Sequence, residues 1–336
     1  MRITHETLLK IASDAVARQA RSSRQLLAAY LCGSLLGEAY LLGGATDIDL
    51  VFIYTEAPDN EREIVRLTDE VHLDIAHHGQ QEYREPRRLR VHPWLGPALN
   101  TCRALYDPQH FMDFVQASVR GQFDRPDHVF ERARKQAEQA RSLWLDLRGL
   151  QGETLPEHIK KYLQSIELTA NSIACLGGPP LTERRFLLTF LERAEAAGRA
   201  GLYAGLLGLI GAPRLTGDNL SEWLLPWQAA YRSLPKEQTP ARLHTDRLFY
   251  YLGAFQALID SDQPVAALWP LLRTWTQAVA LLPPDSPHRR AWQTSLETIG
   301  LSGEGFTERL RALDVYLDMV DETLESWARE NGVWEG

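Results

Sequence analysis

One stretch of the chain, residues 31–52, reads LCGSLLGEAYLLGGATDIDLVF and decides the expected fold. Two short apolar runs border or enter it, residues 28–32 and 48–54, and both have the length and composition of β-strands. The first run ends at Gly33-Ser34, and a glycine-bearing connection leads to the second. The nearly unbroken apolar character of residues 48–54 indicates a strand that is buried on both faces.

Two aspartates, Asp47 and Asp49, stand at the start of the second predicted strand. Side chains two residues apart on a strand point to the same face, so these carboxylates are expected to lie side by side. Their repulsion among apolar neighbours is costly unless a cation lies between them. Magnesium prefers oxygen ligands and accompanies nucleoside triphosphates, so the pair predicts a magnesium site. A pair of solvated acids at a strand start is the alternative.

Gly33 and Ser34 follow directly on the first predicted strand and precede a helix-like stretch, residues 35–41. A glycine allows close approach of the backbone, and the serine offers a hydroxyl and an amide at a helix start, which suits a phosphate. One strand thus delivers a phosphate-binding turn, and the next delivers a metal-binding carboxylate pair. Phosphoryl or nucleotidyl transfer requires this local arrangement.

A third acid, Asp74, interrupts the apolar run of residues 71–76, which is another strand candidate. Apolar neighbours make an unpaired charge expensive there, so Asp74 is expected to ligate the metal or to activate the acceptor hydroxyl. The alternative is an aspartate at a sheet edge that faces water. The adjacent His77 and His78 would point to opposite faces of a strand and are not expected to bind a metal.

The pattern changes along the chain. Residues 8–16 follow helical spacing, and a weaker strand candidate covers residues 102–106. Beyond residue 126 helical patterns follow one another without a convincing strand, at residues 127–149, 156–176, 182–197, 218–233, 241–260, 264–282 and 303–330. We therefore predict an α+β protein, with a small mixed-sheet core over residues 1–122 and an all-helical domain over residues 123–336.

The composition excludes several classes of protein. Hydrophobic residues make up 44% of the chain and charged residues 24%, as in an average soluble protein, and no apolar run approaches the ~20 residues of a membrane span. The formal net charge of −8 argues against a polymeric nucleic-acid partner, because such proteins neutralise phosphates with a basic face. The N-terminal residues do not form a signal peptide, and Cys32, Cys102 and Cys175 match neither a metal motif nor a disulfide framework. A cytoplasmic location is expected.

The stretch quoted above resembles the signature of the DNA polymerase β-like nucleotidyltransferase superfamily. In that family a hydrophobic strand ends in Gly-Ser, and an Asp-x-Asp follows about a dozen residues later. Thr46 replaces the serine that usually precedes the Asp-x-Asp. The resemblance covers about the first third of the chain. It implies a core in which Asp47, Asp49 and, by position, Asp74 ligate Mg²⁺, while Ser34 contacts the triphosphate.

In its layout the chain is similar to the aminoglycoside and lincosamide nucleotidyltransferases. Those enzymes join the same core to a helical domain that closes the acceptor site. By this resemblance, residues 1–122 form the catalytic domain and residues 123–336 form the acceptor-binding and closing domain.

One helical pattern, residues 156–176, carries polar side chains on a face of its own. They are Lys160, Gln164, Glu167 and Asn171. If this face borders a cleft, Lys160 reaches a phosphate and Glu167 acts as the general base for an acceptor hydroxyl; otherwise it is an ordinary solvated face. Arg184, with Arg185, follows an expected helix cap and is either a second phosphate contact or a surface residue.

These features predict a magnesium-dependent nucleotidyltransferase that moves a nucleoside monophosphate from a triphosphate, with ATP as the expected donor, to a hydroxyl of a small molecule. An aminoglycoside-like antibiotic is one version of that acceptor, since polycations suit an acidic protein. The alternatives are an enzyme that attaches AMP to a protein, against which the long helical half argues, and a non-catalytic nucleotide sensor, against which the two intact motif aspartates argue. Neither nucleic acid nor a membrane is an expected partner. The tryptophan-rich half could supply a homodimer interface.

Overall fold

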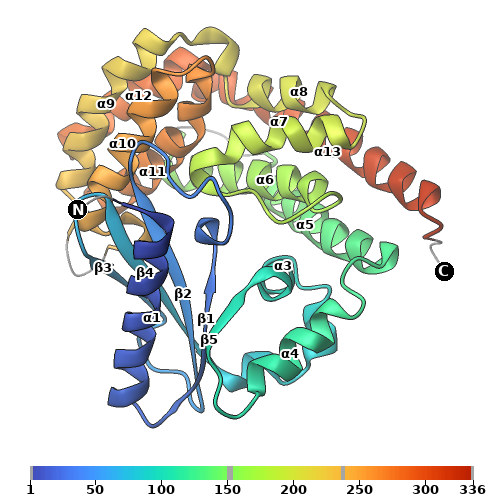
Figure 1. The fold of residues 1–336 in the computed structure, drawn as a ribbon. Coiled ribbons are helices and arrows are strands. Elements are labelled where there is room, and N and C mark those ends of the chain that lie inside the picture. The colour runs from blue at the N-terminus through green and yellow to red at the C-terminus, as the bar shows by residue number, and fades with distance from the viewer. Residues whose placement is uncertain (1–2, 150–153, 236–238, 334–336) are drawn as a thin grey trace. The chain divides into compact units, whose positions relative to one another are not determined.

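The computed structural model describes residues 3–149, 154–235 and 239–333 (Figure 1). The chain divides into two compact units, Met1–His128 and Val129–Gly336. The sequence placed its domain boundary between residues 122 and 123, on the N-terminal side of this division. The first unit contains a mixed sheet and the second contains helices, which confirms the predicted α+β class.

The strands of the first unit form one sheet in the order β3-β4-β2-β1-β5. They are β1 (Leu26–Cys32), β2 (Thr46–Tyr54), β3 (Arg62–Arg66), β4 (Val71–Gly79) and β5 (Arg103–Tyr106). β2 and β4 run parallel, and the other neighbours run antiparallel. The central position of β2 explains why its apolar residues are buried on both faces, as its sequence predicts.

Helices cover both faces of this sheet (Figure 1). The short and long helices of the first unit are α1 (His5–Ser22), α2 (Pro86–Leu89), α3 (Leu95–Thr101) and α4 (Phe111–Arg120). One face packs against α1 through its apolar stripe, which includes Leu8 and Ala12. The other face, which carries Val51 and Ile53, packs against α4 through Met112. Asp47 and Asp49 share the face of Val51 and Ile53, because side chains alternate along β2.

The second unit contains a succession of helices. They are α5 (Pro126–Leu147), α6 (Pro156–Ala174), α7 (Phe186–Ala196), α8 (Gly201–Leu209), α9 (Gly217–Arg232), α10 (Leu248–Ile259), α11 (Leu268–Leu281), α12 (Pro287–Ile299) and α13 (Gly303–Glu330). Large aromatic side chains fill its core, where the rings of Phe186 and Trp269 stack with their centroids 3.9 Å apart. None of the described helices has both the length and the apolar character needed to cross a bilayer.

Six of the described helices and strands lie in segments for which the sequence predicted none: α2, α3, α4, β3, α8 and α12. β3 has the sequence REIVR, whose charges and exposed positions suit the edge of a sheet but conceal the strand pattern. α8 contains three glycines counting its first residue, which weakens its helical signal. α12 carries a helix-start signal, Pro287, and buries Trp292, Leu296 and Ile299 at helical spacing, a pattern that the prediction overlooked. The helix-like stretch expected over residues 35–41 is also wrong, since only the single 3₁₀ turn Ser34–Leu36 forms.

Candidate metal centre

Three aspartates converge near the start of β2 and β4. Because these strands are parallel and in register, Asp49 lies beside Asp74, and Asp47 lies beside His72. Each carboxylate offers an oxygen atom, and these atoms lie within 4.8 Å of one another. Asp47 and Asp74 are only 4% and 3% exposed. The alternative of Asp74 as a water-facing residue at a sheet edge is therefore wrong, because β4 lies between β3 and β2.

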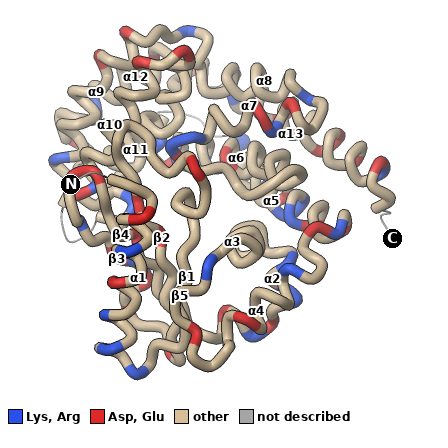
Figure 2. Tube along the Cα trace, viewed as in Figure 1, with Lys and Arg blue, Asp and Glu red and all other residues tan. Residues whose placement is uncertain are grey.

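A guanidinium from the edge strand balances part of this negative charge. Arg62 of β3 donates from Nε to Oδ1 of Asp74 at 2.5 Å and from Nη2 to Oδ2 at 2.7 Å. This bidentate geometry is the strong form of an arginine–carboxylate ion pair. On the other side of the cluster, Nδ1 of His72 lies 3.8 Å from Oδ1 of Asp47. Figure 2 shows acidic and basic positions close together around β2, β3 and β4.

Arg62 was not among the residues predicted from the sequence. An arginine on a short, half-exposed strand has no pattern that marks it, and its partner Asp74 follows only after a chain reversal. The antiparallel register, which pairs Arg62 with Ala76 and Ile64 with Asp74, brings the two side chains together.

The Gly33-Ser34 turn packs directly against this cluster. Gly33 has φ 76° and ψ −160°, a backbone conformation that L side chains rarely adopt. A Cβ atom built on Gly33 would collide with the carboxylate of Asp49. The turn is too short to supply a helix dipole, so any phosphate contact would depend on local backbone amides and the Ser34 hydroxyl.

Cys32 ends β1 next to the same cluster. Its register partner on β2 is Asp49, and its thiol donates to the Asp49 carbonyl at 3.7 Å. Burial first, and then the charge of Asp49, raise the pKa of the Cys32 thiol well above its usual value. This burial and this negative neighbour both disfavour the thiolate form of Cys32.

In the helical unit, three of the four polar residues expected on one face of α6 border a pocket. Lys160, Gln164 and Glu167 line it together with Arg242 and Arg273, and its volume is about 240 Å³. Asn171 does not line it. Its side chain accepts a hydrogen bond from the backbone N–H of Leu181 at 2.7 Å, which ties the following chain to α6.

An arginine joins two acids beside this pocket. Arg273 of α11 forms an ion pair with Glu167, and its Nε lies 3.5 Å from Oε1 of Glu183. Burial would raise the pKa of the Glu183 carboxyl, but Arg242, Arg273 and Arg247, with a hydrogen bond from Tyr251, hold that pKa below its ordinary value. Glu167 is thus ion-paired with Arg273, a contact that the sequence did not predict. Its role as a general base stays a prediction.

Replacing Arg273 with methionine is expected to destabilise the helical unit by roughly 2 kcal/mol at neutral pH, because two largely buried carboxylates lose their shared cation. The pKa of Glu183 is lower in the folded protein than in the unfolded chain, so its ionised form stabilises the fold at pH values above the unfolded pKa. This contribution disappears as the pH falls through the folded-state pKa. The stability difference should therefore shrink below about pH 4. Urea unfolding at neutral pH and below about pH 4 measures this difference in the free energy of unfolding. Lys161→Met, which removes the exposed pair with Asp146, is the control and should change little.

Arg184 is buried, and its guanidinium lies 3.5 Å from the centroid of the Tyr250 ring. Arg247 approaches the same ring at 4.6 Å, so Tyr250 of α10 contacts two cations, one of them from the turn before α7. The surface alternative for Arg184 is therefore wrong, and its contact with a phosphate stays a prediction. Lys160, in contrast, is exposed at the rim of its pocket.

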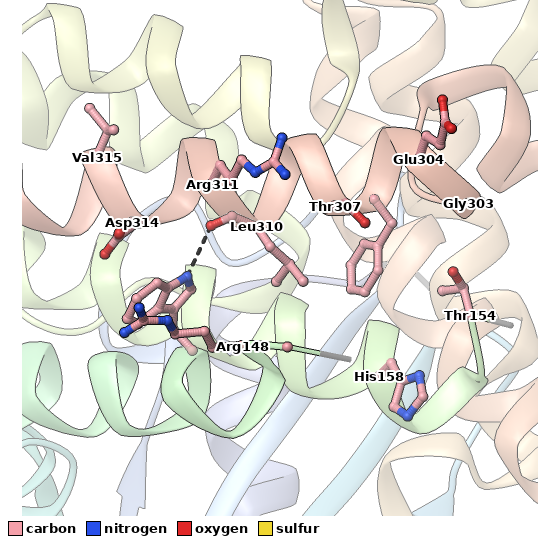
Figure 3. A pocket seen from close by; sticks show the side chains of 13 residues that line it. Arg148, Thr154, His158, Gly303, Glu304, Thr307, Leu310, Arg311, Asp314 and Val315 are labelled. Carbon is pink, nitrogen blue, oxygen red and sulfur yellow. Dashed lines mark hydrogen bonds between the residues drawn. The ribbon is translucent and has the colours of Figure 1, made fainter. Parts of the chain in front are cut away.

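A larger cavity of about 950 Å³ also lies in the helical unit (Figure 3). α13 lines it with residues that include Phe306 and Arg311, and His158 of α6 also lines it. The Trp144 indole donates a hydrogen bond to the Leu310 carbonyl at 2.9 Å and so fixes α5 to α13 at its wall. None of the predicted site residues lines this cavity.

Within the first unit, the fold thus gathers Asp47, Asp49 and Asp74 against the Gly33-Ser34 turn. Within the second unit, Lys160 and Glu167 line one small pocket, and Arg184 is not among the residues that line it. No known family model matches this chain, and no curated protein matches it significantly.

Proposed function

We propose that the chain is a magnesium-dependent nucleotidyltransferase that moves a nucleoside monophosphate from a triphosphate to a hydroxyl group of a small molecule. One observation carries the proposal. Three carboxylates with oxygen atoms within 4.8 Å of one another adjoin a Gly-Ser turn whose glycine has no room for a side chain.

The carboxylates suit a hard divalent cation. All three offer oxygen atoms, as Mg²⁺ prefers, and Asp47 and Asp74 are buried where uncompensated charge is costly. The acidic side chains lie on two adjacent parallel strands, which hold them in fixed register. When bound, Mg²⁺ would neutralise charge on the phosphate oxygens during transfer.

The protein's residues would then position the reactants. Asp47 and Asp49 would hold the metal ion, and the Gly33-Ser34 turn would bind the phosphates of the triphosphate. The acceptor oxygen forms a bond to the α-phosphorus as the bond to the bridging oxygen breaks, so that pyrophosphate leaves. The acceptor proton would pass to a carboxylate, for which Asp74 is the candidate within the first unit.

A hydroxylated, cationic small molecule is the acceptor class that best suits the chain. Its net charge of −8 favours cations over nucleic acid. An aminoglycoside-like antibiotic is the specific version to test first. The AMP-attaching and sensor alternatives predict different products, so the same assay separates them.

A thermal-shift series with ATP, GTP, CTP and UTP, each with and without Mg²⁺, tests the donor site. A triphosphate at about 100 times its dissociation constant should stabilise the fold by roughly 2.7 kcal/mol. The triphosphate that stabilises the protein only with Mg²⁺ is then used with a label on its α-phosphate. Label on a hydroxylated cationic compound, with release of pyrophosphate, is the expected result.

Other outcomes decide between the alternatives. Label on a protein would favour the AMP-attaching enzyme. Metal-dependent binding with no turnover on any acceptor would favour the sensor. The proposal fails if no triphosphate binds with Mg²⁺ and no pyrophosphate is released in the presence of any acceptor.

A further inference from the structure

The edge strand β3 carries two arginines, Arg62 and Arg66, and each forms an ion pair with a different aspartate. Arg62 donates hydrogen bonds to both carboxylate oxygens of the buried Asp74, at 2.5 and 2.7 Å. Arg66 pairs with Asp69 in the β3–β4 connection, where both side chains are about half exposed. Arg62 and Arg66 are themselves equally exposed, at 46% and 47%. Only one of these two ion pairs therefore involves the carboxylate cluster.

Charge explains why Asp74 needs a positive partner. Asp74 is 2% exposed in its side chain and lies beside Asp49, with a third carboxylate, that of Asp47, in the same cluster. Three such neighbours repel one another strongly where water is largely excluded. The Arg62 guanidinium places a positive charge on this cluster and directs hydrogen bonds at both Asp74 oxygens.

The same contact opposes a metal. A divalent cation bound by the three aspartates would supply the positive charge that Arg62 provides, and it would compete for the Asp74 oxygens. A guanidinium and a divalent cation close together also repel each other. Arg62 is half exposed on an edge strand, so its side chain can move into water without opening the core.

We infer that Arg62 is an exchangeable counter-ion for the metal centre: it holds Asp74 while the site is empty, and it leaves when a divalent cation binds. This inference rests on the proposed metal site. Under this inference Arg62 weakens metal binding, because it competes for Asp74, and stabilises the fold when no metal is bound.

The test compares Arg62→Gln, Arg62→Lys and the matched control Arg66→Gln in the full-length protein. Mn²⁺ is the probe, titrated calorimetrically, and melting temperatures are recorded in EDTA and in saturating Mn²⁺. In Arg62→Gln the Mn²⁺ dissociation constant should fall by roughly three- to tenfold, because the competitor is gone and repulsion is relieved. Its melting temperature in EDTA should fall by about 3 °C, and this loss should vanish in Mn²⁺.

The controls separate charge from general damage. Arg66→Gln should leave Mn²⁺ affinity unchanged and should have the same small effect on melting with and without metal, because its pair is exposed. Arg62→Lys keeps the charge but not the two-pronged contact, so its Mn²⁺ affinity should lie between those of the native protein and Arg62→Gln.

Two results would overturn the inference, and they differ from failure of the proposed function. If the native protein binds Mn²⁺ but Arg62→Gln binds it equally or more weakly, Arg62 orients Asp74 in the metal-bound state and is not exchanged. If the native protein and all the variants bind no Mn²⁺, the metal site itself is wrong, and the inference falls with the proposed function.

Discussion

Asp49→Asn is expected to lower nucleotidyl transfer roughly a thousandfold and to abolish the Mg²⁺-dependent thermal shift. Asp49 lies beside Asp74 in the β2–β4 register, and its carboxylate occupies the position that a side chain on Gly33 would need. Asp49 is therefore central to the carboxylate cluster. Asparagine has nearly the same shape but removes the charge that binds the cation. The rate of pyrophosphate release and the melting temperature with and without Mg²⁺ measure the two effects.

The same substitution should not destabilise the metal-free protein. Removing one of three neighbouring charges relieves repulsion, so the melting temperature in EDTA should stay constant or rise. This combination of lost activity and retained stability distinguishes a ligand from a structural residue. Asp69→Asn is the control, because Asp69 is an exposed acid in the β3–β4 connection, and its activity should be normal. Retained transfer and a retained Mg²⁺ shift in Asp49→Asn would refute the metal centre.

Gly33→Ala should destabilise the protein by about 2–5 kcal/mol and should also remove the Mg²⁺-dependent shift. Two costs add. The φ of 76° is strained for any residue with a Cβ, and the new methyl group would collide with the Asp49 carboxylate. Because β1 and β2 are paired at Cys32 and Asp49, relief of the collision must displace the carboxylate or the turn. Urea unfolding with a constant slope measures the stability change.

Two other glycines separate these costs. Gly44 has φ 74° but open space around its Cβ position, so Gly44→Ala should show the backbone cost alone, about 1 kcal/mol. Gly37 has φ −115° and an ordinary contact at 3.8 Å, so Gly37→Ala should be nearly neutral. If Gly33→Ala is no worse than Gly44→Ala, the close packing of the turn on Asp49 is not important for stability.

The local part of the site could be read from the sequence because it depends on short-range geometry. The two-residue period of a strand places Asp47 and Asp49 on one face, and the apolar run around them identifies β2 as an interior strand. The glycine at the end of β1 indicates a turn that a side chain would obstruct. The helical spacing of Lys160, Gln164 and Glu167 likewise predicts a shared face, and these residues line one pocket.

Contacts across the sheet could not be read in this way, because strand order and register are set by packing between distant segments. Asp74 was expected in the cluster from its apolar neighbours and from the family resemblance, but it is the parallel pairing of β4 with β2 that brings it beside Asp49. The hairpin of β3 with β4 brings Arg62 onto Asp74. In the helical unit, packing of α11 on α6 places Arg273 against Glu167. The sequence by itself thus determined which side chains share a strand or helix face, since backbone periodicity is local. Only the tertiary structure decided which charges meet, because that depends on how the apolar faces of separate elements are buried together.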